Sequence, residues 1–226
     1  MSQRHKLAIV GAEPHTRENA PYDNQDYDIW SFSDWLLADW LKRCDAIIEI
    51  HGIEIYRNHP RSPGYWDALQ KTTVPIYMYP FADQKVQSSK EYPLDAVLGM
   101  LHNAKASGKP FKNLNCTTVY AIALGIYMGY EVIDVYGVEL WPDSPYNKQR
   151  ADFAFWIGFA AGRGIELNVN CSEKLFNHQL YGIEDKTPTA RLQELMGVVA
   201  KQKDEAVRTA NTADGALQLI RQLLEE

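Results

Sequence analysis

The sequence lacks the features that mark several large classes of protein. Its 226 residues include three cysteines, Cys44, Cys116 and Cys171, with no C-x-x-C pair, so we expect a reducing cytoplasm and no disulfide framework. No apolar run reaches roughly 18 residues, which predicts no membrane span. The N-terminus enters a strand-like run too soon for a signal peptide. The formal net charge of −6 gives no support to a nucleic-acid partner.

Common ligand-binding motifs are also absent. The lack of G-x-G-x-x-G argues against an ordinary NAD or FAD site, and the lack of a Walker sequence argues against a P-loop ATPase. The six histidines show no H-x-x-x-H, and none stands at zinc spacing from a cysteine, so no metal site is predicted. What remains is a composition with 46% hydrophobic and 23% charged residues, which suits one globular α/β domain with a small appendage.

Short apolar runs alternate with helical patterns along most of the chain. This alternation predicts an α/β, Rossmann-like fold for residues 1–186, with a mostly parallel sheet and helices on both faces. Strands are expected at 6–10, 28–32, 46–50, 74–78, 131–136 and 165–169, and helices at 34–42, 94–105, 116–130 and 152–163. Many aromatic residues fall in expected loops, where packing against the core is preferred over a ring-stacking pocket; they include Tyr22, Tyr27, Tyr65, Trp66, Trp141 and Tyr146.

Residues 187–226 differ from the rest and are predicted to form a helical tail. Pro188 suits the first turn of a helix. From Leu192 to Leu224, apolar residues follow alternating four- and three-residue steps, with Lys203 filling the one gap. Turn formers at 211–215 leave open whether the tail is one helix or two. The apolar stripe needs another apolar surface to pack against. We expect a partner subunit to supply this surface in preference to the tail's own domain, so we predict a homo-oligomer.

The segment Asn115–Leu140 is the most informative part of the chain. It has a polar helix start, an apolar helix, a Gly-Tyr stop and a strand that ends in Gly-Val-Glu. A helix that precedes a parallel strand runs antiparallel to it, so the start of the helix and the end of the strand meet at one edge of the sheet. This edge is predicted to bind a ligand, and it brings together Cys116, Thr117, Thr118, Gly137 and Glu139.

The start of the helix at Cys116 is a candidate anion site. Backbone N–H groups and the Thr117 and Thr118 hydroxyls can meet a phosphate or carboxylate, although plain capping is an equal alternative. Cys116 is less favoured as a nucleophile, because no matching triad accompanies it. After the first strand, Gly11 and Ala12 allow close backbone approach, and Arg17 can meet a phosphate.

Further candidates come from the other loops of this edge. Ser31 follows the second strand. His51 follows the third and is the natural general base near neutral pH, although hydrogen bonding to a loop carbonyl is the preferred alternative. Glu139 can bind ribose or sugar hydroxyls, or cap a loop. Three residues before a helix can reach over the same edge: Tyr146, Gln149 and Arg150. Arg150 can hold a phosphate, or it can instead pair with an acidic residue on the surface.

Two stretches carry a resemblance to known families. A-I-A-L-G-I-Y-M-G-Y followed by V-I-D-V-Y-G-V-E-L resembles the second half of the Rossmann-like fold of family-42 sialyltransferases. It is also similar to archaeal 6-hydroxymethylpterin diphosphokinase-like proteins, and Y-N-K-Q-R-A-D-F-A-F-W-I-G-F-A-A-G-R-G is similar to uncharacterised, often phage-encoded relatives. The resemblance covers residues 11–171 and implies a nucleotide or nucleotide-sugar at this edge, with Tyr146 near the donor phosphate.

Three departures from that pattern bear on the reaction. The first loop is G-A-E-P-H-T-R instead of Gly- and Asn-rich, Glu139 stands where Asp is usual, and only the distant His178 is a candidate for the late catalytic histidine. The first hypothesis is a nucleotide- or nucleotide-sugar-dependent transferase, acting by glycosyl or diphospho transfer, with His51 as base. The second is a non-catalytic protein that sequesters or senses a nucleotide, and the third is a structural protein without a ligand. No cofactor is assigned; a divalent metal bound together with the nucleotide is the one candidate.

Overall fold

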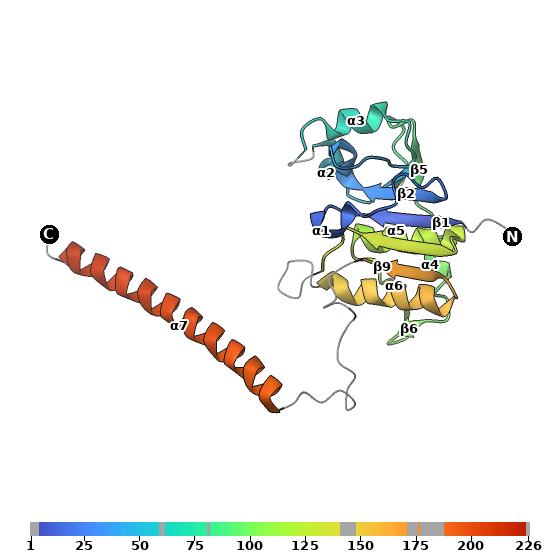
Figure 1. Ribbon diagram of the computed structural model, residues 1–226. Helices are drawn as coiled ribbons and strands as arrows, with labels where there is room; N and C mark the ends of the chain where they lie inside the picture. The colour runs from blue at the N-terminus through green and yellow to red at the C-terminus, as the bar shows by residue number, and fades with distance from the viewer. Residues whose placement is uncertain are drawn as a thin grey trace. The chain divides into compact units, whose positions relative to one another are not determined.

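The computed structural model describes residues 5–58, 62–80, 82–140, 148–170, 176 and 188–224 (Figure 1). The chain divides into two compact units, residues 1–177 and residues 178–226. Cys171, Tyr146 and His178 lie outside the described residues.

The first unit is built on a seven-stranded sheet in the order β5-β4-β3-β2-β1-β8-β9. Every pairing in this sheet is parallel. The predicted Rossmann-like α/β class is therefore confirmed. The strands are β1 (Lys6–Val10), β2 (Tyr27–Phe32), β3 (Ala46–Glu49), β4 (Ile76–Met78), β5 (Ser89–Glu91), β8 (Val132–Tyr136) and β9 (Glu166–Val169).

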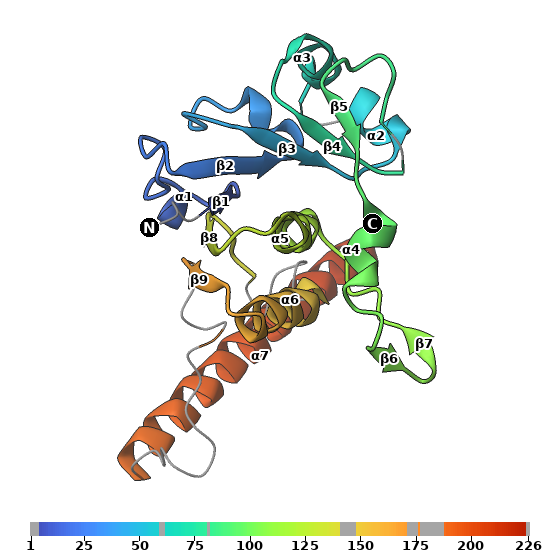
Figure 2. The same cartoon turned by 90° about the vertical axis from the view of Figure 1, so that its right-hand side faces the viewer.

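Helices cover both faces of the sheet. Figure 2 shows α5 on one side of strands β2 to β4 and α3 on the other. The helices of this unit are α1 (Pro14–Arg17), the 3-10 helix η1 (Ser33–Leu37), α2 (Ile53–Arg57), α3 (Tyr65–Lys71), α4 (Leu94–Gly99), α5 (Thr117–Met128) and α6 (Arg150–Gly162), and a small hairpin joins β6 (Lys105–Ala106) to β7 (Lys109–Pro110).

The largest core cluster lies between the sheet and α5. Alternate residues of β1 point to opposite faces, so Leu7 and Ile9 join this cluster while Ala8 and Val10 join another. Gly125 lets the helix pack close to β1, since a Cβ at this position would lie only 2.6 Å from Leu7 Cδ2. Apolar residues on both sides of α5 are buried, although Tyr127 and Met128 in its last turn are exposed.

The end of α5 follows the sequence prediction. Gly129 caps the helix in the left-handed region at φ 83°, and the Tyr130 N–H donates to the Gly125 carbonyl at 3.2 Å. This pattern matches a glycine C-cap with a long closing hydrogen bond. The chain then enters β8 directly, and the order of helix, stop and strand expected for residues 115–140 is confirmed.

The helix expected at 34–42 is not formed. Residues 33–37 make the short η1, and Ala38 is extended at φ −83° and ψ 130°. Leu36 packs on the cluster around Ile47, whereas Trp40 and Leu41 pack on the separate cluster around Val10. One straight helical face cannot serve both clusters, so the chain turns between them.

Several other helices and strands differ from the sequence prediction because their sequences are polar or lack a regular apolar pattern. The helix expected at 94–105 ends at Gly99, and the β6–β7 hairpin follows, turning at Ser107 and Gly108 with positive φ. Strand β5 is polar and lies at the edge of the sheet, so it carries no apolar pattern. Helices α2 and α3 were not expected. Three aromatic residues expected in loops lie in regular elements: Tyr27 in β2, and Tyr65 and Trp66 in α3.

The second unit contains one long helix, α7 (Pro188–Leu224). The turn formers at 211–215 do not break it. The Thr209 hydroxyl donates to the Glu205 carbonyl at 3.0 Å, and the Thr212 hydroxyl donates to the Arg208 carbonyl at 2.9 Å. These side chains thus bond to the preceding helical turn instead of ending the helix. None of the helices described is both long enough and apolar enough to span a bilayer.

Candidate functional site

A cleft of about 880 Å³ lies at the carboxyl edge of the sheet. The chain runs outward from β1 to β5 on one side and continues with β8 and β9 on the other, so the strand order reverses between β1 and β8. Open α/β sheets bind ligands at such a reversal. Eight of the residues predicted from the sequence line this cleft: Ala12, His51, Cys116, Thr117, Thr118, Gly137, Glu139 and Gln149.

The floor of the cleft is formed where the loops after β1 and β8 touch. The Gly11 N–H donates to the Tyr136 carbonyl, and the Glu13 N–H donates to the Gly137 carbonyl, both at 2.9 Å. Gly137 has a φ of 62°, and a Cβ there would lie 2.5 Å from the Gly11 carbonyl oxygen. Glycine is thus required at both positions for the two backbones to approach.

The start of α5 forms one wall. Cys116 is the N-cap with extended backbone, and Thr117 and Thr118 occupy the first turn. Burial raises the pKa of the Cys116 thiol to about 11, although hydrogen bonds from the Val119 and Thr118 N–H groups act in the opposite direction. A thiol with so high a pKa is a poor nucleophile, which agrees with the absence of a matching triad in the sequence.

A buried carboxylate at the end of β3 holds His51. The Glu49 side chain is 0% exposed, whereas the His51 side chain is 37% exposed. Glu49 Oε1 accepts hydrogen bonds from His51 Nδ1 at 2.7 Å and from the His51 backbone N–H at 2.9 Å. Glu49 Oε2 accepts one from the Tyr65 hydroxyl at 2.7 Å.

This contact defines the chemistry of the imidazole. Because the carboxylate accepts from Nδ1, the neutral ring carries its hydrogen on Nδ1. The lone pair is then on Nε2, which is the form that a general base requires. The alternative expected from the sequence, a hydrogen bond from His51 to a loop carbonyl, stays a prediction beside this carboxylate contact.

Four predicted residues do not line the cleft. Gly11 lies beneath it. Arg17 Nη1 donates to the Ala12 carbonyl at 2.5 Å, and its guanidinium lies over the Trp40 ring at 4.5 Å. Ser31 is buried and donates to the Val10 carbonyl at 2.9 Å. Arg150 is the half-buried first residue of α6.

Hydrogen bonds bring α6 to the start of α5. The Asn115 side-chain amide donates to the Lys148 carbonyl at 3.0 Å, and the Trp156 indole donates to the Asn113 carbonyl at 2.6 Å. Burial raises the pKa of Asp152, which accepts from the Asn113 amide. These contacts place Gln149 at the rim, one residue before Arg150.

Sequence reasoning missed several lining or supporting residues. Glu49 follows the third strand but was given no role from the sequence, although it contacts His51 two residues away. The role of Tyr65 needs α3 to bring its hydroxyl to Glu49. Glu13 carries no signal that distinguishes it from the rest of its loop. Apolar and aromatic side chains line the side of the cleft near η1, namely Phe32, Trp35, Leu37 and Ile50. The aromatic richness of the sequence was the available signal for that surface.

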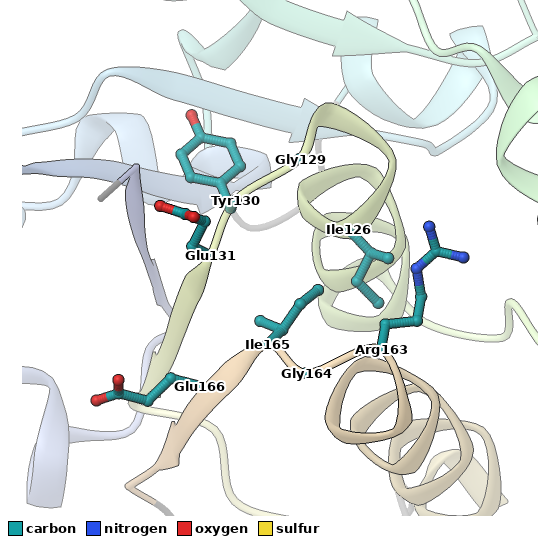
Figure 3. A pocket seen from close by; sticks show the side chains of 8 residues that line it. All are labelled: Ile126, Gly129, Tyr130, Glu131, Arg163, Gly164, Ile165 and Glu166. Atoms are coloured by element: carbon teal, nitrogen blue, oxygen red, sulfur yellow. The ribbon is translucent and has the colours of Figure 1, made fainter. Parts of the chain in front are cut away.

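A second cavity, of about 560 Å³, lies at the opposite edge of the sheet (Figure 3). It is lined by the ends of α5 and α6 and the starts of β8 and β9. Its one arginine, Arg163, lies over the Phe159 ring, and Glu131 and Glu166 are exposed. Helix C-termini carry the negative end of the helix dipole, and the N–H groups of Gly129, Glu131 and Ile165 already donate to backbone carbonyls, so this cavity is not the candidate anion site.

Within the described ranges, no group of three or more His, Cys, Asp or Glu side chains could hold a metal ion. A divalent metal bound together with a nucleotide therefore stays a prediction. Such an ion would need ligand oxygens from the nucleotide itself.

One solved sialyltransferase shares the fold, and another is similar. The monofunctional α-2,3-sialyltransferase Cst-I from Campylobacter jejuni is 12% identical, covers 89% of this chain and 96% of its own, and has a TM-score of 0.51. The sialyltransferase CstII from the same organism, solved with cytidine-5'-monophosphate, is 15% identical, with 74% and 80% coverage and a TM-score of 0.46. No protein-family model and no curated protein matches the chain.

At these identities the likeness to Cst-I shows the fold alone. It agrees with the sialyltransferase part of the resemblance carried by residues 116–140. The suggested likeness to 6-hydroxymethylpterin diphosphokinase-like and phage-encoded proteins receives no support from the comparisons.

Proposed function

We propose that the protein is a glycosyltransferase-like enzyme that takes a sugar from a nucleotide-sugar bound in the cleft. One observation carries the proposal: His51, oriented by the buried Glu49, and the start of α5 line the same cleft at the strand-order reversal. Cst-I, whose fold this chain shares, is by name a transferase. That likeness favours sugar transfer over other uses of a nucleotide.

The donor phosphate would lie at the start of α5. The Thr117 and Thr118 hydroxyls and the positive end of the helix dipole favour an anion there. Ala12 and Gly137 would let the backbone approach the nucleotide, and Glu139 would accept hydrogen bonds from ribose or sugar hydroxyls. We also propose that the phosphate is contacted by Gln149, Arg150 and Tyr146.

The remaining predicted residues would act from below the ligand. Gly11 and Ser31 shape the floor, and Arg17 fixes the Ala12 carbonyl of the first loop. The aromatic side of the cleft, with Phe32 and Trp35, suits the flat apolar face of a base or sugar ring.

The transfer step needs one base and a stabilised leaving group. His51 Nε2 would take the proton of the acceptor hydroxyl as its oxygen attacks the anomeric carbon. The bond from that carbon to the phosphate oxygen breaks, and the nucleotide leaves with the electron pair. Glu49 would stabilise the imidazolium that forms, as the carboxylate does in a Ser-His-Asp triad. Positioning and charge stabilisation would supply most of the rate enhancement.

The charge of the lining favours a donor with one phosphate. Among the described lining residues there is no Lys or Arg, whereas Glu13 and Glu139 carry negative charge. Each further phosphate charge would be repelled by these carboxylates. We therefore expect nucleoside-monophosphate sugars to bind more tightly than nucleoside-diphosphate sugars.

The first test is to identify the ligand class. Small molecules that copurify with the native protein would be identified by mass spectrometry. Mono- and diphosphate nucleotide-sugars would then be incubated with the enzyme and a mixed acceptor panel, with nucleotide release as the readout. A released nucleoside monophosphate and a glycosylated acceptor support the proposal. Absence of binding and release with every donor refutes it.

A non-catalytic nucleotide-binding protein is the second candidate. The acidic lining favours it, because Glu13 and Glu139 would oppose the negative charge that develops on a leaving phosphate. Under this alternative a nucleotide raises the melting temperature but is recovered unchanged after long incubation.

A further inference from the structure

The long helix α7 exposes a regular apolar seam. Within the second unit, every described side chain from Leu192 to Leu224 is exposed. The seam follows the a and d positions of a heptad without a break, and alternates steps of four and three residues. Its members are Leu192, Met196, Val199, Lys203, Ala206, Ala210, Ala213, Leu217, Ile220 and Leu224.

The residues beside the seam widen it at both ends. Leu195 and Leu223 occupy g positions, next to the seam. The two glycines, Gly197 and Gly215, fall at outward-facing positions, where they do not interrupt packing. A helix with this stripe buries it most effectively against another helix with the same repeat.

We propose that two copies of α7 pair as an antiparallel coiled coil. With the two helices centred on residue 208, each a residue of one copy meets a d residue of the other. Large residues then meet large ones at the two ends, as Leu192 meets Leu224 and Met196 meets Ile220. Small residues meet in the middle, where Ala206 meets Ala210. The same offset aligns all ten seam positions, so one register satisfies the whole stripe.

Charge selects this direction over the parallel one. In a parallel pair Lys203 would face Lys203 of the second copy at an a position, where like charges destabilise the pair. In the antiparallel register Lys203 faces Ala213, and Asp214 of the second copy lies on the same side, about 1.5 Å along the axis. The pair forms twice in the dimer, once at each symmetry-related position.

The oligomeric state of the full chain tests the seam. The mass in solution, measured by light scattering, is expected to be twice the chain mass of 25.8 kDa. Leu217→Ser should give monomers, because it opens the seam. Leu219→Ser is the matched control, since Leu219 is equally exposed, at 58% against 53%, but lies off the seam. A monomeric wild-type chain, or equal effects of the two variants, overturns the proposal.

Charge reversal tests the direction. Lys203→Asp and Asp214→Lys should each raise the dimer dissociation constant about tenfold, because each change acts at two places. The double variant should return it to within about threefold of wild type. Lys201→Asp, the same change on the outward face, should alter it less than about twofold. Failure of the double variant to restore dimerisation overturns the antiparallel register.

Discussion

The close approach of the loops after β1 and β8, beneath the cleft, can be tested by adding a single methyl group. In Gly137→Ala the new Cβ would lie 2.5 Å from the Gly11 carbonyl oxygen and 2.9 Å from its carbonyl carbon. The backbone at φ 62° also disfavours any L side chain. The β1 and β8 loops would have to separate, although they are held by the hydrogen bond from Glu13 to Gly137.

The expected loss of stability follows from three contributions. An alanine in the left-handed region costs about 1–2 kcal/mol. Overpacking against a backbone atom costs about 1–3 kcal/mol. The lower entropy of the unfolded alanine chain returns about 0.4–1 kcal/mol. The free energy of unfolding should therefore fall by about 1–4.5 kcal/mol, measured by urea unfolding followed by tryptophan fluorescence.

Two other glycines separate these contributions. Gly129→Ala keeps only the conformational cost, since φ is 83° and no atom lies within 4 Å of the new Cβ, so the loss should be about 1 kcal/mol. Gly158→Ala, in the exposed face of α6, should raise stability by about 0.5–1 kcal/mol. If Gly137→Ala is no more destabilising than Gly129→Ala, the close approach of the two loops is wrong.

Three further predictions concern buried polar groups. Tyr65→Phe removes one hydrogen bond to the buried Glu49, so stability should fall by about 1–2 kcal/mol in urea unfolding. Burial raises the pKa of Tyr22 and Tyr56 to about 12 each, so the folded protein keeps these protons longer than the unfolded chain does. Stability should therefore fall as pH rises from 10 towards 12, in unfolding curves compared at pH 9 and pH 11. Cys116 should react with iodoacetamide at pH 8 at least about tenfold more slowly than a free thiol, by peptide mass spectrometry.

Local pattern was sufficient where one face or one cap determines the structure. The apolar runs of β1, β3 and β8 and the Gly129 stop of α5 are properties of adjacent residues, and each was predictable. The direction of α5 relative to β8 then followed from the parallel sheet. Thr117 and Gly137 could therefore be placed at one edge from the sequence alone.

Pattern was insufficient where distant parts of the chain decide the outcome. The segment after β2 turns at Ala38 because Leu36 and Trp40 belong to separate core clusters, which no local periodicity reveals. The hydrogen bond from Tyr65 to Glu49 joins residues 16 positions apart through an unpredicted helix. Arg17 looked available for a phosphate, but it is engaged by Trp40 and by the Ala12 carbonyl.

The turnover of a nucleotide-sugar by His51→Ala tests the central claim most directly. With the donor that wild type uses best, nucleotide release should fall about 10²–10⁴-fold, while the donor dissociation constant stays within about threefold. His102→Ala is the matched control, since His102 contacts the Gly99 carbonyl and does not line the cleft; it should retain full turnover. If His51→Ala turns over the donor as fast as wild type, His51 is not the base and the proposed mechanism is wrong.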